Sequence, residues 1–258
     1  MIKTISKTIS QISAAEQICR PEVDLHVHTV ASGHAYSTIE EITRAAAAKG
    51  MKGVGMTDHG PSMPGAPHVY HFMGLRFVPE WLNGVRVFKG VESNILDDGQ
   101  VDLGDDFLSC LDVVLAGFHA DCGYSGTTAA QHTKTMMQVM ENPLVHIISH
   151  PGNPEFPIDH LAVVQQAVAT GTALEINSSS FCNARCGSKP NCIDIAQLCA
   201  EHGALIAIGS DAHISLTVGE VAEAIEVVQQ AGIRWEQVVN RTLESTLNFL
   251  NIEGIIKL

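Results

Sequence analysis

The stretch Val23-Asp24-Leu25-His26-Val27-His28 decides how the rest of this chain is interpreted. Apolar and polar residues alternate along it, which predicts a short strand with one apolar face. Because successive side chains of a strand point to opposite faces, Asp24, His26 and His28 share the other face. Two imidazoles two residues apart on one face can chelate a metal ion. The stretch therefore predicts a strand that begins a metal site, whose other ligands must come from elsewhere in the chain.

Length and composition indicate one globular domain with a large core. The chain has 258 residues, of which 45% are hydrophobic and 17% are charged, as is ordinary for folded proteins. A single α/β barrel commonly has about 250 residues. We expect one domain over residues 21–258, preceded by an extension over residues 1–20. Isoleucines at helix-like spacing predict a short amphipathic helix in this extension.

Charge and cysteine content restrict the partners and the compartment. The net charge of −13 argues against a broad nucleic-acid surface, which needs a basic face. No window of about 18 apolar residues is present, so no membrane span is expected. The seven cysteines are scattered and no secretory signal is visible, which indicates a cytoplasmic protein with free thiols. Cys182, Cys186 and Cys192 lack a standard zinc spacing, so a zinc site there is a minor alternative.

Seven predicted strands alternate with helical segments along the chain. The strands are expected at residues 23–28, 52–57, 85–91, 111–116, 145–149, 173–176 and 204–208. Capping motifs at Ser37-Thr38-Ile39-Glu40 and at Thr217-x-x-Glu220 predict two of the helix starts. The β-then-α order requires parallel strands, as in a barrel or a doubly wound sheet. Polar residues follow all seven strands, and only a barrel brings all seven ends to one mouth. We therefore predict an α/β fold, a TIM-like (β/α)7 barrel.

Nine imidazoles and carboxylates at the strand ends and in one loop are candidate metal ligands. They are His26, His28, His34, His59, Glu92, His119, His150, Asp211 and His213. A catalytic zinc takes about three protein ligands, so nine suit two or three ions that share a bridging carboxylate, for which Glu92 is the natural choice. Nitrogen and oxygen ligands without thiolate suit zinc, manganese or iron. Asp24 and Asp58 are expected to orient ligand histidines through hydrogen bonds.

The motifs around these ligands resemble those of the PHP (polymerase and histidinol phosphatase) superfamily. They are Asp24-Leu25-His26-Val27-His28-Thr29, Thr57-Asp58-His59-Gly60, Gly90-Val91-Glu92, Gly117-Phe118-His119, Ser149-His150-Pro151 and Gly209-Ser210-Asp211-Ala212-His213. The stretches 34–38, 146–154 and 175–181 are similar to those of the YcdX-type phosphatases. The resemblance implies that the seven-stranded barrel is distorted and carries a trinuclear metal site, usually described as zinc.

The resemblance also implies which side chains hold each of three ions. The first would be held by His26, His28, Glu92 and Asp211. The second would be held by Glu92, His119 and His150, and the third by His34, His59 and His213. All nine family positions are filled in this sequence, so the resemblance implies a complete site.

The expected function is hydrolysis of phosphate monoesters by attack of a hydroxide that bridges metal ions. The expected partner is therefore a small phosphorylated substrate, and a homo-oligomer is compatible with the sequence. Asn177, Arg185 and His68 are candidate substrate contacts. Arg185 suits a phosphate because a guanidinium can donate two parallel hydrogen bonds.

Three other functions stay open. A 3′–5′ exonuclease or phosphodiesterase of the PHP type would act on DNA ends, although the acidic chain argues against it. An amidohydrolase-like C–N hydrolase often uses a modified lysine as the bridging ligand, but Lys89 is expected to face away from Glu92. A non-catalytic metal-binding domain would hold metal tightly without turning over any ester.

Overall fold

Seven parallel strands form the centre of the fold in the computed structural model, which describes residues 20–181 and 184–253. In chain order they are β1 (Val23–Asp24), β2 (Gly53–Met56), β4 (Val85–Asn94), β5 (Val113–Gly117), β6 (Ile147–Ile148), β7 (Ala173–Asn177) and β8 (Ile206–Gly209). Each pairs in parallel with the next in this order. The predicted seven-stranded α/β barrel is therefore confirmed. The sequence did not predict β3 (Trp81–Leu82), which pairs antiparallel with the start of β4.

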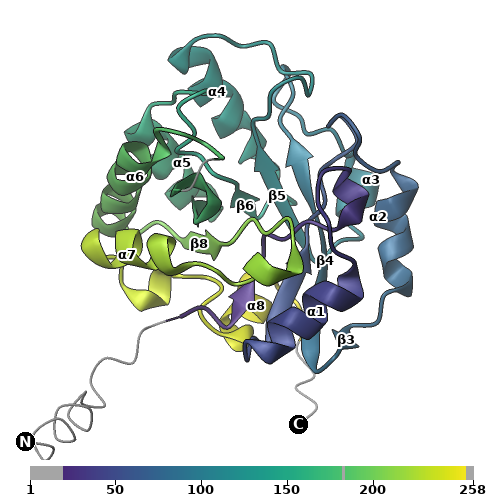
Figure 1. Ribbon diagram of the computed structural model, residues 1–258. Helices are drawn as coiled ribbons and strands as arrows, with labels where there is room; N and C mark the ends of the chain where they lie inside the picture. The colour runs from purple at the N-terminus through teal and green to yellow at the C-terminus, as the bar shows by residue number, and fades with distance from the viewer. Residues whose placement is uncertain (1–19, 182–183, 254–258) are drawn as a thin grey trace, which may run out of the picture.

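Helices of the described residues surround these strands (Figure 1). They are α1 (Ile39–Ala48), α2 (Tyr70–Gly74), α3 (Asp105–Leu108), α4 (Ala129–Val139), α5 (His160–Thr170), α6 (Ser188–His202), α7 (Ala222–Gln230) and α8 (Leu243–Phe249). Short 3-10 turns are η1 (Val30–Ser32), η2 (Leu75–Phe77), η3 (Ser179–Phe181), η4 (Ser215–Thr217) and η5 (Trp235–Gln237). Within the described ranges, no helix has the length and apolar character needed to cross a lipid bilayer. The helix predicted in residues 1–20 falls outside the described residues, apart from Arg20.

The two predicted capping motifs had different outcomes. At α1 the Thr38 hydroxyl accepts a hydrogen bond from the Glu41 N–H, and the Glu41 carboxylate accepts one from the Thr38 N–H, one residue later than predicted. The second prediction was wrong, because Thr217 ends the turn η4 and α7 begins without a side-chain cap. Glu220 instead pairs with Lys49, whose Nζ lies 2.6 Å from its Oε1. The loop after β8 is therefore attached to the end of α1.

Backbone hydrogen bonds close the barrel at its mouth, between the segments that follow β1 and β8. Asp211 N donates to His26 O and His28 N donates to Ala212 O, both at 2.9 Å. The predicted strand over residues 23–28 therefore contains only two residues of regular ladder, and its second half pairs through an isolated bridge.

A side chain replaces direct pairing of β1 and β8 farther from the mouth. The fully buried Asn240 donates from Nδ2 to Val23 O and to Ile208 O, each at 2.7 Å. Its Oδ1 accepts from Ile208 N at 3.0 Å. One amide thus bridges the two strands here in place of a continuous ladder.

Alternation along the strands produces two apolar layers. In β5, Val113 and Leu115 belong to a cluster that joins residues of β1, β4, β6, β7 and β8 inside the barrel, closed at the bottom by Leu247 of α8. Val114 and Ala116 belong to the outer cluster, between the strands and the helices. The apolar interior fills the bottom of the barrel, so polar side chains are left to occupy the mouth.

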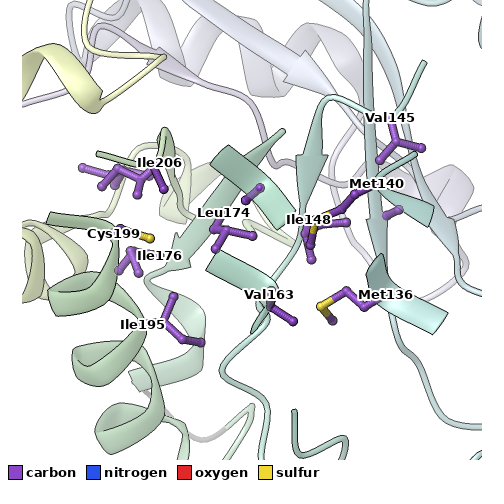
Figure 2. Close-up of a cluster of buried hydrophobic side chains, with 14 of the residues drawn as sticks. Met136, Met140, Val145, Ile148, Val163, Leu174, Ile176, Ile195, Cys199 and Ile206 are labelled. Atoms are coloured by element: carbon purple, nitrogen blue, oxygen red, sulfur yellow. The ribbon is translucent and has the colours of Figure 1, made fainter. Parts of the chain in front are cut away.

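The outer layer fixes the strands that carry the site. Figure 2 shows its part between β6–β8 and helices α4–α6, where the labelled side chains point toward one another. They include Met136, Met140, Ile148, Val163, Leu174, Ile176, Ile195, Cys199 and Ile206. Full burial of such a side chain stabilises the fold by about 1.5–3 kcal/mol. This packing holds the ends of β6–β8 in place beneath the mouth.

Candidate metal centre

All nine predicted ligands meet at the mouth of the barrel. Five of them line a cavity of about 620 Å³, and the other four are buried and do not line it. The lining five are His34, His59, His119, Asp211 and His213, and the other four are His26, His28, Glu92 and His150. Convergence of strand ends at one mouth is what a barrel provides, and the structure brings together every residue of this predicted set.

Glu92 lies at the centre, and one of its oxygens faces three histidines. Its Oε2 lies 3.2 Å from His26 Nε2, 3.4 Å from His28 Nε2 and 3.1 Å from His59 Nδ1. Its Oε1 faces a different pair, with His119 Nε2 at 3.3 Å and His150 Nε2 at 2.8 Å. The carboxylate therefore separates two groups of imidazoles, as expected for a bridging ligand.

Asp211 lies close to two histidines of the first group and to His213. Its Oδ1 lies 3.2 Å from His28 Nε2, 3.6 Å from His26 Nε2 and 3.5 Å from His213 Nδ1. His34 belongs to the same region, because its ring centroid lies 4.9 Å from that of His213. His34 also stacks on His59, with 5.1 Å between the ring centroids.

The arrangement leaves buried polar atoms that a metal ion would satisfy. Buried polar atoms normally have a hydrogen-bond partner. Yet His59 Nδ1, Glu92 Oε2 and Asp211 Oδ1 have none among the described residues. Three sets of ligand atoms each lie within 4.8 Å of one another, and each could hold an ion. The sets are His26, His28 and Glu92; His59, Glu92 and His119; and His28, His59 and His213. Oxygen and imidazole donors of this kind suit zinc and similar divalent ions.

The surroundings keep most of these groups in the form that binds metal, which must be deprotonated. Burial alone would raise the pKa of Glu92, but His26 and His119 hold that pKa well below its usual value. Burial lowers the pKa of His150 to about 4, and Arg185 acts in the same direction. Burial also lowers the pKa of His59 well below its usual value. For His26, the neighbouring carboxylates outweigh burial and raise the pKa well above its ordinary value.

The predicted orienting roles of Asp24 and Asp58 were wrong in detail. Asp24 accepts hydrogen bonds from the backbone N–H of His26, Ser210 and Gly219, so it fixes the loop after β8 rather than an imidazole. Asp58 does not contact the His59 ring. It accepts from Thr29, from Ser32 Oγ at 2.6 Å and from His71 Nε2 at 3.1 Å, which are its partners in the described residues.

Ser32 and Glu175 orient ligand histidines, and sequence reasoning missed both. Ser32 Oγ lies 3.1 Å from His28 Nδ1. Glu175 Oε1 lies 2.8 Å from His26 Nδ1, with Glu175 only 1% exposed. A signal for Glu175 was present, because it stands between two apolar residues of the buried strand Ala-Leu-Glu-Ile-Asn. A carboxylate in such a strand requires a buried partner.

The three predicted substrate contacts occupy different positions. Arg185 lines the cavity, and its Nη1 donates to Asp211 Oδ2 at 2.9 Å. Asn177 is fully buried, and its amide group contacts Glu175 and Asp211 instead of the cavity. His68 is exposed, packs against Tyr70 and is not one of the residues that line the cavity. Of the three, only Arg185 therefore lines the cavity beside the predicted ligands.

The cysteines of the described residues take no part in the centre. Cys192 is buried and burial raises the pKa of its thiol to about 12, whereas Cys186 is exposed. Neither belongs to a group of potential metal ligands in the described ranges. Cys182 lies outside those ranges.

Comparison with known proteins identifies similar chains. The family model described as "PHP domain" matches residues 24–244. A "Probable phosphatase" of Syntrophotalea carbinolica is 56% identical, and the match covers 90% of this chain and 97% of that protein. A "Probable phosphatase" of Shewanella frigidimarina is 44% identical, with 90% and 94% covered.

A solved structure supports the fold. The histidinol phosphate phosphatase of Lactococcus lactis, complexed with zinc, L-histidinol and phosphate, has a TM-score of 0.58. The match covers 82% of this chain and 94% of that one, at 16% sequence identity. At this identity, the likeness concerns the fold alone.

Proposed function

Because the chain belongs to the PHP domain family, we propose that it is a metal-dependent phosphatase that hydrolyses phosphate monoesters at a trinuclear zinc site. The observation that carries this proposal is the convergence of nine ligands at the mouth of the barrel, where five histidines face the Glu92 carboxylate and three buried ligand atoms lack a partner among the described residues. The names of the relatives support the same reaction. The zinc and phosphate of the Lactococcus lactis structure support the choice of metal and substrate group.

Each proposed ion has its own set of side chains. His26, His28 and Asp211 would hold the first, and His119 and His150 would hold the second, with Glu92 shared between them. His34, His59 and His213 would hold the third. When bound, such ions provide a water molecule with a lowered pKa and neutralise charge on the phosphoryl oxygens.

The residues of the chain bind and orient the substrate. Arg185 is the only lysine or arginine among the described residues that line the cavity. One of its N–H groups donates to Asp211, and a guanidinium carries five, so others can contact a phosphoryl oxygen. A single cation beside the metal ligands suits one phosphate group. The cavity of about 620 Å³ suits a small leaving group.

The acidic chain and the small cavity favour a monoester over a nucleic acid. A polynucleotide needs a basic groove along its backbone, whereas the net charge here is −13. The C–N hydrolase alternative loses support because Lys89 lies on β4 three residues before Glu92, and the five groups around that carboxylate are all histidines.

Phosphate release from a panel of esters tests the proposal. Metal-loaded protein should release phosphate from monoesters, and product analysis should show no hydrolysis of a diester, an amide or single-stranded DNA. The variant H26A should lose this activity, while H202A, which removes an exposed histidine of α6, should retain it. Absence of phosphate release by the metal-loaded protein, or equal release by H26A, would refute the proposal. Salt-sensitive DNA binding with cleavage from the 3′ end would support the exonuclease.

A further inference from the structure

We propose that Glu175 is a positioning residue that holds ligands of two metal positions at once, through His26 and through His150. The inference rests on the proposed trinuclear site and adds the side chain that fixes its geometry. Glu175 lies in β7, is 1% exposed and is not itself one of the nine ligands. Its two carboxylate oxygens serve two different parts of the centre.

The first oxygen determines which nitrogen of His26 is free to bind metal. Glu175 Oε1 lies 2.8 Å from His26 Nδ1. An ionised carboxylate only accepts hydrogen bonds, so the neutral ring of His26, which is the form that binds metal, carries its proton on Nδ1. Nε2, which lies 3.2 Å from Glu92 Oε2, then keeps its lone pair for a metal ion. Glu175 thus presents His26 to the first metal position in the tautomer that can bind.

The second oxygen holds the backbone of His150. Glu175 Oε2 accepts from His150 N at 2.9 Å. His150 has a positive φ of 33°, which non-glycine residues rarely adopt, so this turn needs an anchor. The turn directs His150 Nε2 to within 2.8 Å of Glu92 Oε1, at the second metal position.

The third position is independent of Glu175. In the described part of the chain, Glu175 accepts one further side-chain hydrogen bond, from Asn177 Nδ2 at 3.1 Å. None of its hydrogen bonds joins it to His34, His59 or His213. This asymmetry gives the inference a specific consequence: loss of Glu175 should weaken two metal positions and spare the third.

The variant E175Q keeps the shape of the side chain but replaces one of its two acceptor oxygens by an NH2 group, which donates. If its amide oxygen faces His26, its NH2 group opposes the N–H of His150. If the NH2 group faces His26 instead, the proton moves to Nε2 and blocks the ligand atom. Either orientation damages a position. Loss of a residue that orients metal ligands typically lowers metal affinity by 10–100-fold. We expect this loss at two positions and less than a twofold change at the third.

Zinc titration of the metal-free protein by calorimetry, with chelator competition, measures these affinities without any substrate. The variant H34A identifies the third position in the titration. The control Q237M removes another buried amide, which bonds to Cys199 O and Ala204 O away from the mouth. It should lower stability and leave all three affinities unchanged. In a second variant, G209A, the carboxylate stays but a Cβ would overlap Glu175 Oε1 and would also lie 3.0 Å from His26 Cβ, so its effect on the second position is the one that reports on Glu175. It should weaken the same two positions.

Folded E175Q or G209A with wild-type affinity at every position would overturn the inference. So would weakening of one position alone, or equal weakening of all three. Should E175Q fail to fold by circular dichroism, G209A decides the question. The proposed function fails separately: a protein that binds three zinc ions and releases no phosphate would refute the phosphatase and leave the role of Glu175 intact.

Discussion

Replacement of Asn240 by leucine should destabilise the barrel without touching the metal centre. Leucine has a similar size, so little cavity is created. Three buried backbone groups lose their partner, namely Val23 O, Ile208 O and Ile208 N. A buried group left without a partner costs about 1–3 kcal/mol. We therefore expect N240L to lower the free energy of unfolding by about 3–5 kcal/mol. This is near the lower end of the summed cost of three such groups, because the neighbouring backbone can relax.

Urea unfolding of the metal-free protein, followed by circular dichroism, measures this loss. Metal must be absent, because an ion that binds only the folded state would add its own stabilisation. The matched control is N248L, which changes an exposed asparagine of α8 and should stay within about 0.5 kcal/mol of the wild type. A loss of less than about 1 kcal/mol in N240L, or one no larger than in N248L, would refute the view that this amide joins β1 to β8.

Three further predictions concern single side chains. His146 accepts a backbone hydrogen bond on Nδ1, and burial lowers its pKa to about 4. Its contribution to the free energy of unfolding should be complete above pH 6.5 and should fall by about 2–3 kcal/mol as the pH drops to 4. Urea unfolding of the metal-free protein measures this loss, which the variant H146N should lack. Replacement R185K keeps the charge and removes the planar fork, so kcat/KM for a monoester should fall about 10–100-fold, and an unchanged value in steady-state kinetics would contradict the substrate contact. The variant S32A removes the hydroxyl that contacts His28, so its zinc affinity in chelator competition should be about 10–100-fold lower. The variant S109A, which changes an exposed serine, should match the wild type.

The strands and the ligands could be predicted because their signals are local. An apolar run that ends in histidine or a carboxylate, repeated along the chain, predicts both a parallel strand and a residue at the mouth. Such a signal identified Glu92 and His119 equally well, although one lies inside β4 and the other lies beyond β5. The exact strand ends were less predictable. β1 and β6 each have two residues of regular ladder, because pairing depends on the neighbouring strand as well as on the run itself.

The supporting residues could not be predicted, because their partners are distant in the sequence. Asn240 bonds to Val23 O, 217 residues away. Glu175 bonds to His26, 149 residues away. Neither has a motif around it that names its partner. The capping motif at residues 217–220 failed for a related reason, since Glu220 pairs with Lys49 from α1. A long-range ion pair there replaced the local hydrogen bond that the pattern indicates.

His150 and Asp211 show why the site and the closure of the barrel depend on one another. Both adopt left-handed backbone, with φ values of 33° and 56°, at a cost of about 1–3 kcal/mol each. Glycine would relieve this strain but would remove the ligand. The strain is instead offset by hydrogen bonds of their own N–H groups, from His150 N to Glu175 Oε2 and from Asp211 N to His26 O, both at 2.9 Å. The second of these bonds also closes the barrel at its mouth. The turn that presents Asp211 to the metal centre is therefore stable only when β1 is in place, and the opening strand supplies both a ligand and the acceptor that orients another.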